Sequence, residues 1–116
     1  MCGITGFVLN NKLDNTILRK MVSRLYHRGP DEEGYYKDGR FNGGQRRLSI
    51  NDLKNGTQPL YNKDKSIVLL YNGEIYNYHE LKKDLEKKGY IFRTHSDGEV
   101  ICHLYDEYGE QLFNLL

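Results

Sequence analysis

The chain has 116 residues, which is enough for one small domain. Its two cysteines are too few for a disulfide framework. It contains 17 lysines and arginines against 16 aspartates and glutamates. The formal net charge is +1, and Lys and Arg are spread along the chain, so we expect no nucleic-acid partner. The sequence contains neither a run long enough to span a membrane nor a signal-peptide pattern, so we expect no membrane partner and a soluble, cytoplasmic protein.

The first half of the chain predicts strands around one helix. Residues 4–9 predict a strand that starts almost at the terminus. Apolar residues at helical spacing predict a helix over 15–26. Residues 34–37 and 41–50 predict two further strands, and the Asp38-Gly39 pair between them is typical of a hairpin turn.

The second half adds helices to this pattern. The apolar centre of residues 66–71 predicts a strand covered on both faces. A helix over 78–88 and a short strand over 90–93 follow, and Ser96 with Glu99 predicts a capping box at the start of another helix. Strands and helices do not alternate regularly, which favours the α+β class over a doubly wound sheet.

Cys2 is the first candidate for chemistry. If Met1 is removed, Cys2 carries both a thiol and a free α-amino group, whose unperturbed pKa is about 8. One residue can then supply the nucleophile and the base, as in N-terminal nucleophile enzymes. The alternative is an ordinary cysteine that packs as a small apolar residue near a frayed end.

Acyl transfer from an amino-acid amide needs three further groups, and the chain has a candidate for each. A substrate carboxylate needs a cation, which the segment Arg46-Arg47-Leu48-Ser49-Ile50 can supply. A substrate ammonium needs a carboxylate, and the segment Ser96-Asp97-Gly98-Glu99 has an acid at a predicted helix start. An oxyanion needs amide donors, and Asn72 with Gly73 follows an apolar strand.

Each of these residues also has a purely structural interpretation. Asn72-Gly73 is also the sequence of a plain turn, and Asp97 is also a suitable helix cap. Arg47 suits a solvated strand, and Arg28 suits the end of the first helix. Spacing alone leaves these alternatives open, because it does not show that the residues converge in space.

Six sequence motifs follow one another along the chain. They are Met1-Cys2-Gly3-Ile4-Thr5-Gly6, His27-Arg28-Gly29-Pro30-Asp31, Arg47-Leu48-Ser49-Ile50-Asn51-Asp52, Gly56-Thr57-Gln58-Pro59-Leu60, Tyr71-Asn72-Gly73-Glu74-Ile75-Tyr76-Asn77 and Ser96-Asp97-Gly98-Glu99-Val100. With these motifs in this order, the sequence resembles class II glutamine amidotransferases of the asparagine synthetase kind, and the similarity extends to about Tyr108. The Arg-Leu-Ser-Ile segment is similar to that branch rather than to the glucosamine-phosphate synthase and phosphoribosylamine-forming branches.

The resemblance implies an N-terminal-nucleophile (Ntn) hydrolase fold, an αββα sandwich of two antiparallel sheets between helical layers. It implies that Cys2 is the nucleophile and that its α-amine is the general base. The Asn72 side chain and the Gly73 backbone N–H would form the oxyanion hole for glutamine hydrolysis.

The resemblance also assigns the substrate-binding residues. Arg47 would hold the glutamine carboxylate, and Asp97 with Glu74 would hold its ammonium group. Ile50 and Asn51 would line the pocket through backbone groups.

In the family, ammonia passes to a C-terminal synthetase domain that uses ATP and Mg. We therefore expect residues 1–116 to be a partial, truncated glutaminase domain without the synthetase domain and without a cofactor of its own. L-glutamine, the synthetase domain and a second copy in a homodimer are the candidate partners. The alternative is a truncated, non-catalytic relic or interaction module.

No zinc site is expected from the sequence. The candidate zinc ligands are His79, His95, Cys102 and His103, and they do not fall at zinc-ligand spacings.

Overall fold

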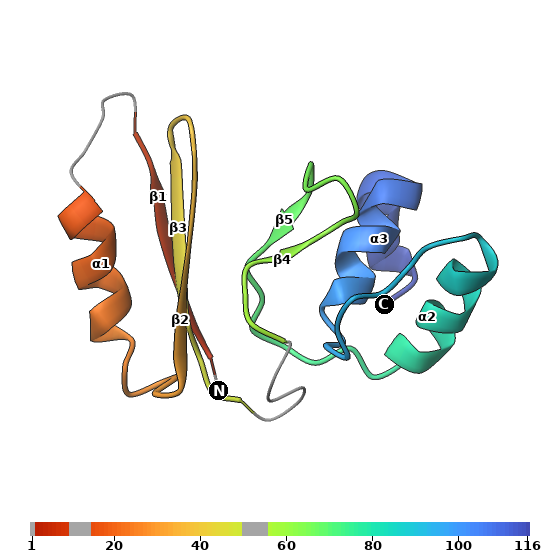
Figure 1. The fold of residues 1–116 in the computed structure, drawn as a ribbon, viewed down its shortest axis with the longest axis horizontal. Helices are drawn as coiled ribbons and strands as arrows, with labels where there is room; N and C mark the ends of the chain where they lie inside the picture. Colours follow the sequence, from red (N-terminus) through yellow and green to blue (C-terminus); the bar gives the residue numbers. More distant parts are fainter. Residues whose placement is uncertain (1, 10–14, 50–55) are drawn as a thin grey trace. The chain divides into compact units, whose positions relative to one another are not determined.

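A computed structural model describes residues 2–9, 15–49 and 56–116. It is an α+β protein with antiparallel sheets and divides into two compact units (Figure 1). The first unit consists of Met1–Ile50, Thr57–Pro59 and Leu70–Asn72, and the second of Asn51–Gly56, Leu60–Leu69 and Gly73–Leu116.

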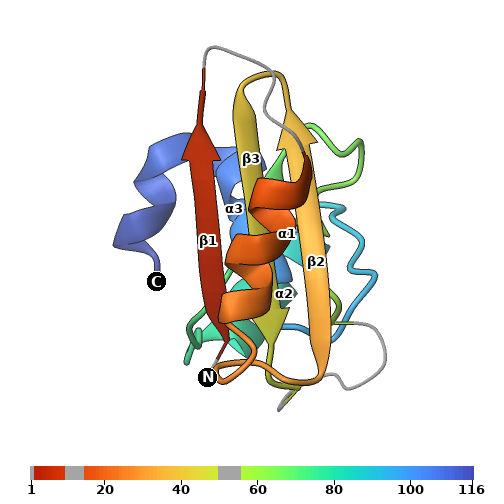
Figure 2. The same cartoon turned by 90° about the vertical axis from the view of Figure 1, so that its left-hand side faces the viewer.

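The first unit is a three-stranded antiparallel sheet with one helix. Strands β1 (Gly3–Val8), β2 (Glu32–Asp38) and β3 (Phe41–Arg47) lie in the order β1-β3-β2. Helix α1 (Asn15–Arg24) covers one face of this sheet (Figure 2). The three predicted strands and the predicted helix are confirmed with small shifts at their ends. Strand β3 ends at Arg47, so Leu48 and Ser49 lie beyond it, and residue 50 of the predicted strand lies outside the described residues.

The predicted hairpin between β2 and β3 is also confirmed. Asp38 pairs with Phe41, so the loop has two residues, and Gly39 at its start adopts a φ of +53°. Glycine populates this left-handed region without the steric cost of a side chain. The tight turn fixes the register of the whole hairpin, as far as the pair between Glu32 and Arg47.

Close packing joins α1 to the sheet. Leu18 and Val22 are buried, and a Cβ atom at Gly44 would lie 2.4 Å from Cγ2 of Val22. The absence of a side chain at Gly44 therefore lets the helix approach the middle strand. Side chains alternate along a strand, so Gln45 and Arg47 point to the face away from α1.

The second unit packs two helices and a short 3₁₀ segment beside a two-stranded sheet. Its elements are β4 (Leu60–Tyr61), β5 (Val68–Leu69), α2 (Tyr78–Lys87), α3 (Glu99–Tyr108) and η1 (Gly109–Asn114). The buried side chains at its core come from both helices and η1, and they are Leu85, Val100, Leu104 and Leu112.

Three expectations for this unit are wrong. The strand predicted over 66–71 is only Val68–Leu69, and its residues are half-buried instead of covered on both faces. Residues 90–93 form no strand, because the Arg93 N–H donates to the Glu99 carboxylate rather than to a neighbouring strand. The capping box is absent because Glu99 reaches back to Arg93 and Thr94, while the Ser96 N–H donates to the Thr94 hydroxyl.

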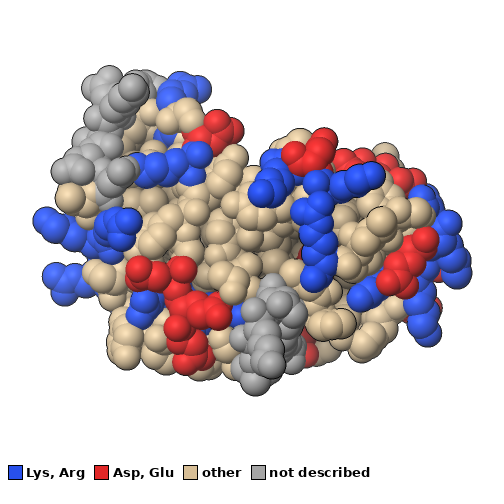
Figure 3. Space-filling view, viewed as in Figure 1, with Lys and Arg blue, Asp and Glu red and all other residues tan. Residues whose placement is uncertain are grey.

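Within the described part of the chain, no helix is long and apolar enough to cross a bilayer. Acidic and basic side chains are interspersed on the face drawn in Figure 3.

Candidate functional site

The end of the sheet where β1 begins and β3 ends carries Cys2 and Arg47. Strands β1 and β3 pair Gly3 with Arg46, so Cys2, one residue before β1, lies at the same sheet end as Arg47. The two arginines of β3 point to opposite faces. Arg46 stacks over the Tyr26 ring just beyond α1, whereas Arg47 binds Glu32.

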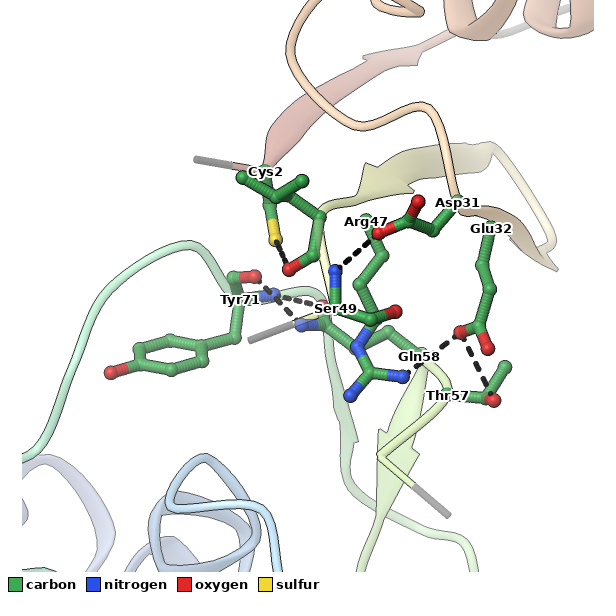
Figure 4. Close-up of polar contacts among 9 residues, drawn as sticks. Cys2, Asp31, Glu32, Arg47, Ser49, Thr57, Gln58 and Tyr71 are labelled. Carbon is green, nitrogen blue, oxygen red and sulfur yellow. Dashed lines mark hydrogen bonds and ion pairs between the residues drawn. The ribbon is translucent and has the colours of Figure 1, made fainter. Parts of the chain in front are cut away.

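Cys2 is half-buried and held at two points. Its backbone carbonyl accepts a hydrogen bond of 3.2 Å from Nε of Arg28. Its Sγ lies 3.9 Å from the carbonyl oxygen of Leu48, in the segment that follows β3 (Figure 4). The main chain at the thiol is therefore fixed, and Arg28 does more than close the first helix.

The second thiol is chemically different. Cys102 is fully buried in α3. Burial, together with the negative charge of Glu99, raises the pKa of the Cys102 thiol to about 12. A thiol with so high a pKa stays protonated at neutral pH and is a poor nucleophile.

Arg47 is nearly inaccessible, with 4% of its surface exposed. Its NH1 donates to Oε2 of Glu32 at 3.0 Å, and the Thr57 hydroxyl donates to the same oxygen at 3.2 Å (Figure 4). A buried cation needs such a partner, because leaving it unpaired costs several kcal/mol. Glu32 was not among the residues predicted from the sequence, although the register of the hairpin leads directly to it.

The segment from Arg28 to Asp31 ties the ends of these strands together. The Asp31 N–H donates to the Arg47 carbonyl at 3.1 Å, and Oδ2 of Asp31 accepts from the Ser49 N–H at 2.8 Å. Gly29 lies so close to β3 that a Cβ there would be 2.5 Å from the carbonyl carbon of Arg46. This segment therefore determines where Cys2 and Arg47 are held.

We expect Gly29→Ala to destabilise the protein by about 2 kcal/mol or more, because the neighbour that must move is backbone. Gly39→Ala is the matched control: a Cβ there meets nothing within 4 Å, and only the φ of +53° is unfavourable, at a cost of about 1 kcal/mol. Chemical denaturation of both variants measures the difference. Equal stability of the two would contradict the close approach at Gly29.

Gln58 holds the chain just before Asn72. Its Nε2 donates to the Tyr71 carbonyl at 2.8 Å, and its Oε1 accepts from the Tyr71 N–H at 2.6 Å (Figure 4). The side chain thus pairs with the backbone as a neighbouring strand would. Gln58 is buried, and its bond to Pro59 is cis. Asn72 follows Tyr71 directly and is exposed.

The second unit contains the remaining predicted site residues. Gly73 and Glu74 are exposed, whereas Asp97 is 7% exposed. Oδ2 of Asp97 accepts a hydrogen bond of 2.7 Å from the Ile75 N–H. Asp97 is thus fastened to the segment that begins at Gly73.

The predicted residues fall into three groups. Cys2 and Arg47 share one end of the sheet in the first unit, which also contains Asn72. Asp97 is joined to the segment containing Gly73 and Glu74 in the second unit. Ile50 and Asn51 lie outside the described residues. Among the residues that the structure describes, no three His, Cys, Asp or Glu side chains gather as metal ligands.

The whole chain, residues 1–116, matches the family model of the glutamine amidotransferase domain. Asparagine synthetase [glutamine-hydrolyzing] 1 of Bacillus subtilis (strain 168) is 44% identical over 116 residues, covering 96% of this chain and 18% of the relative. Asparagine synthetase [glutamine-hydrolyzing] 1 of Arabidopsis thaliana is 48% identical over 120 residues, covering all of this chain and 20% of the relative. The chain thus spans about a fifth of the length of these relatives.

Proposed function

Because the chain belongs to the glutamine amidotransferase domain family, we propose that it hydrolyses the side-chain amide of glutamine with Cys2 as the nucleophile. The observation that carries this proposal is the placement of Cys2. Its backbone is anchored by Arg28, and it shares a sheet end with the buried cation of Arg47. The other cysteine is buried and protonated, so Cys2 is the thiol suited to attack.

The reaction requires that Met1 has been removed. The free α-amine of Cys2 takes the proton of the thiol as Sγ attacks the amide carbon of glutamine. The Asn72 side chain and the Gly73 N–H stabilise the oxyanion of the tetrahedral intermediate. The intermediate collapses to a glutamyl thioester, and the ammonium proton of Cys2 passes to the departing ammonia. Water activated by the same amine then attacks the thioester, which releases glutamate and restores the thiol.

Substrate recognition uses the two charged ends of glutamine. Arg47, fixed by Glu32, binds the α-carboxylate, since a guanidinium can donate to both oxygens. Asp97 and Glu74 bind the α-ammonium. Ile50 and Asn51 line the pocket through their backbone groups.

We further propose the wider setting that the family suggests. The sheet covered by α1 is one layer of an Ntn αββα sandwich. Ammonia passes to a synthetase domain that uses ATP and Mg to make asparagine, and residues 1–116 need no cofactor of their own. The protein works in the cytoplasm, where thiols stay reduced, and a homodimer is its candidate assembly.

Labelling with 6-diazo-5-oxo-L-norleucine, a reactive glutamine analogue, tests the proposal. We expect a single adduct on Cys2 in protein that lacks Met1, visible in the mass of the N-terminal peptide. Excess glutamine should protect against it, and a Cys102→Ala variant should be labelled like the wild type. A folded, correctly processed protein that forms no adduct would favour the non-catalytic relic instead.

A further inference from the structure

The loop that precedes α3 is held by a carboxylate from inside the protein. Glu99 is 2% exposed, and both of its oxygens accept hydrogen bonds from this loop. Oε1 accepts from the Arg93 N–H at 2.8 Å, and Oε2 accepts from the Thr94 N–H at 2.7 Å and the Thr94 hydroxyl at 2.6 Å. One side chain therefore fixes two successive residues of the loop.

Glu99 makes these bonds as an anion. Burial by itself raises the pKa of Glu99, but the nearby His103 ring, the Thr94 hydroxyl and the two backbone N–H groups outweigh it and lower the pKa to about 2. Nε2 of His103 lies 3.4 Å from Oε1, outside hydrogen-bond geometry but near enough for an ion pair when the ring is protonated. An ionised carboxylate accepts stronger hydrogen bonds than a neutral acid.

The same contacts lead on to Asp97. The Thr94 hydroxyl, which donates to Glu99, accepts a hydrogen bond of 3.2 Å from the Ser96 N–H, next to Asp97 in the chain. Asp97 in turn accepts from the Ile75 N–H at 2.7 Å, two residues after Gly73. These hydrogen bonds, joined through the peptide link between Ser96 and Asp97, therefore connect Glu99 to the segment proposed to bind the ammonium group and the oxyanion.

We propose that Glu99 and Thr94 are positioning residues that set the preference of the site for a substrate with an α-ammonium group. They act through the backbone of residues 93–97, which presents the carboxylate of Asp97. This inference rests on the proposed function, because it takes Asp97 as the group that binds the ammonium of glutamine.

The test compares two inhibitors of glutamine hydrolysis by the full-length protein. Glutamate has the α-ammonium group, and glutarate is the same molecule without it. Thr94→Val keeps the shape of the side chain but removes the hydroxyl. We expect it to raise the inhibition constant of glutamate about 5- to 10-fold, the effect of one hydrogen bond, and that of glutarate less than about 2-fold. Thr94→Ser, which restores the hydroxyl, should return both constants to wild-type values.

Two further variants complete the test. Glu99→Gln should show the same selective loss for glutamate as Thr94→Val, and Glu86→Gln, on an exposed position of α2, should leave both constants unchanged. Equal changes for glutamate and glutarate, or no change in Thr94→Val and Glu99→Gln, would overturn the inference while leaving the proposed function intact. Wild-type protein that hydrolyses no glutamine would overturn the proposed function and this inference with it.

Discussion

Cys2→Ala is expected to lower kcat for glutamine hydrolysis by at least about 10³-fold, because no other group in the site can form the thioester. The KM for glutamine should change little, since the groups proposed to bind substrate remain. Cys2→Ser keeps a hydroxyl but has no accessible thiolate, so it should also lose most activity. The rate of ammonia release at steady state, measured for the wild type, Cys2→Ala and Cys2→Ser, gives kcat and KM for each.

Two controls separate the thiol from the α-amine and from Cys102. Inserting a leucine between Met1 and Cys2 blocks methionine removal and places the α-nitrogen of Cys2 in a peptide bond. This variant should be inactive although its thiol is present. Cys102→Ala should retain wild-type kinetics, because the Cys102 thiol is buried and protonated. Activity that survives in Cys2→Ala, or that fails in Cys102→Ala, would contradict the assigned nucleophile.

The hairpin shows how far local sequence signals reach. The Asp38-Gly39 turn was predictable, and it fixes the pairing of Asp38 with Phe41. Counting outward from that pair places Glu32 opposite Arg47, so the partner of the buried cation could have been predicted. The length of the second strand was underestimated, because Glu32 and Glu33 do not look like strand residues, and the third strand ends at Arg47, earlier than predicted.

Contacts between side chains and distant backbone were beyond prediction. Gln58 pairs with the backbone of Tyr71, 13 residues away in sequence, and no periodicity marks such a bond. Likewise, the spacing of Ser96 and Glu99 fits a capping box, but Thr94 and the Arg93 N–H compete for the same carboxylate. Local patterns thus predicted the helices and the three-stranded sheet, whereas the short strands of the second unit and the bonds that hold the site residues required the tertiary structure.

Arg47→Lys is expected to raise the KM for glutamine by about 10²-fold while kcat falls much less. A lysine keeps the charge but cannot donate to both carboxylate oxygens in the planar geometry of a guanidinium. It also cannot make the same bond to Glu32 while facing the substrate. Steady-state kinetics with glutamine gives both parameters, and thermal unfolding shows whether the variant remains folded.

Neighbouring ion pairs of the same hairpin provide a matched test of the anchor. Glu32→Gln removes the charge that holds Arg47, so we expect the KM for glutamine to rise about 5- to 10-fold, as for the loss of one charge-assisted hydrogen bond. Glu33 pairs with Arg46 on the other face of the sheet, with 44% of its side chain exposed. Because the Glu33 carboxylate is exposed to solvent, its ion pair contributes little, so Glu33→Gln should stay within about 2-fold of wild type. Equal effects of the two substitutions would mean that the Glu32–Arg47 pair stabilises the hairpin but does not orient a substrate-binding cation.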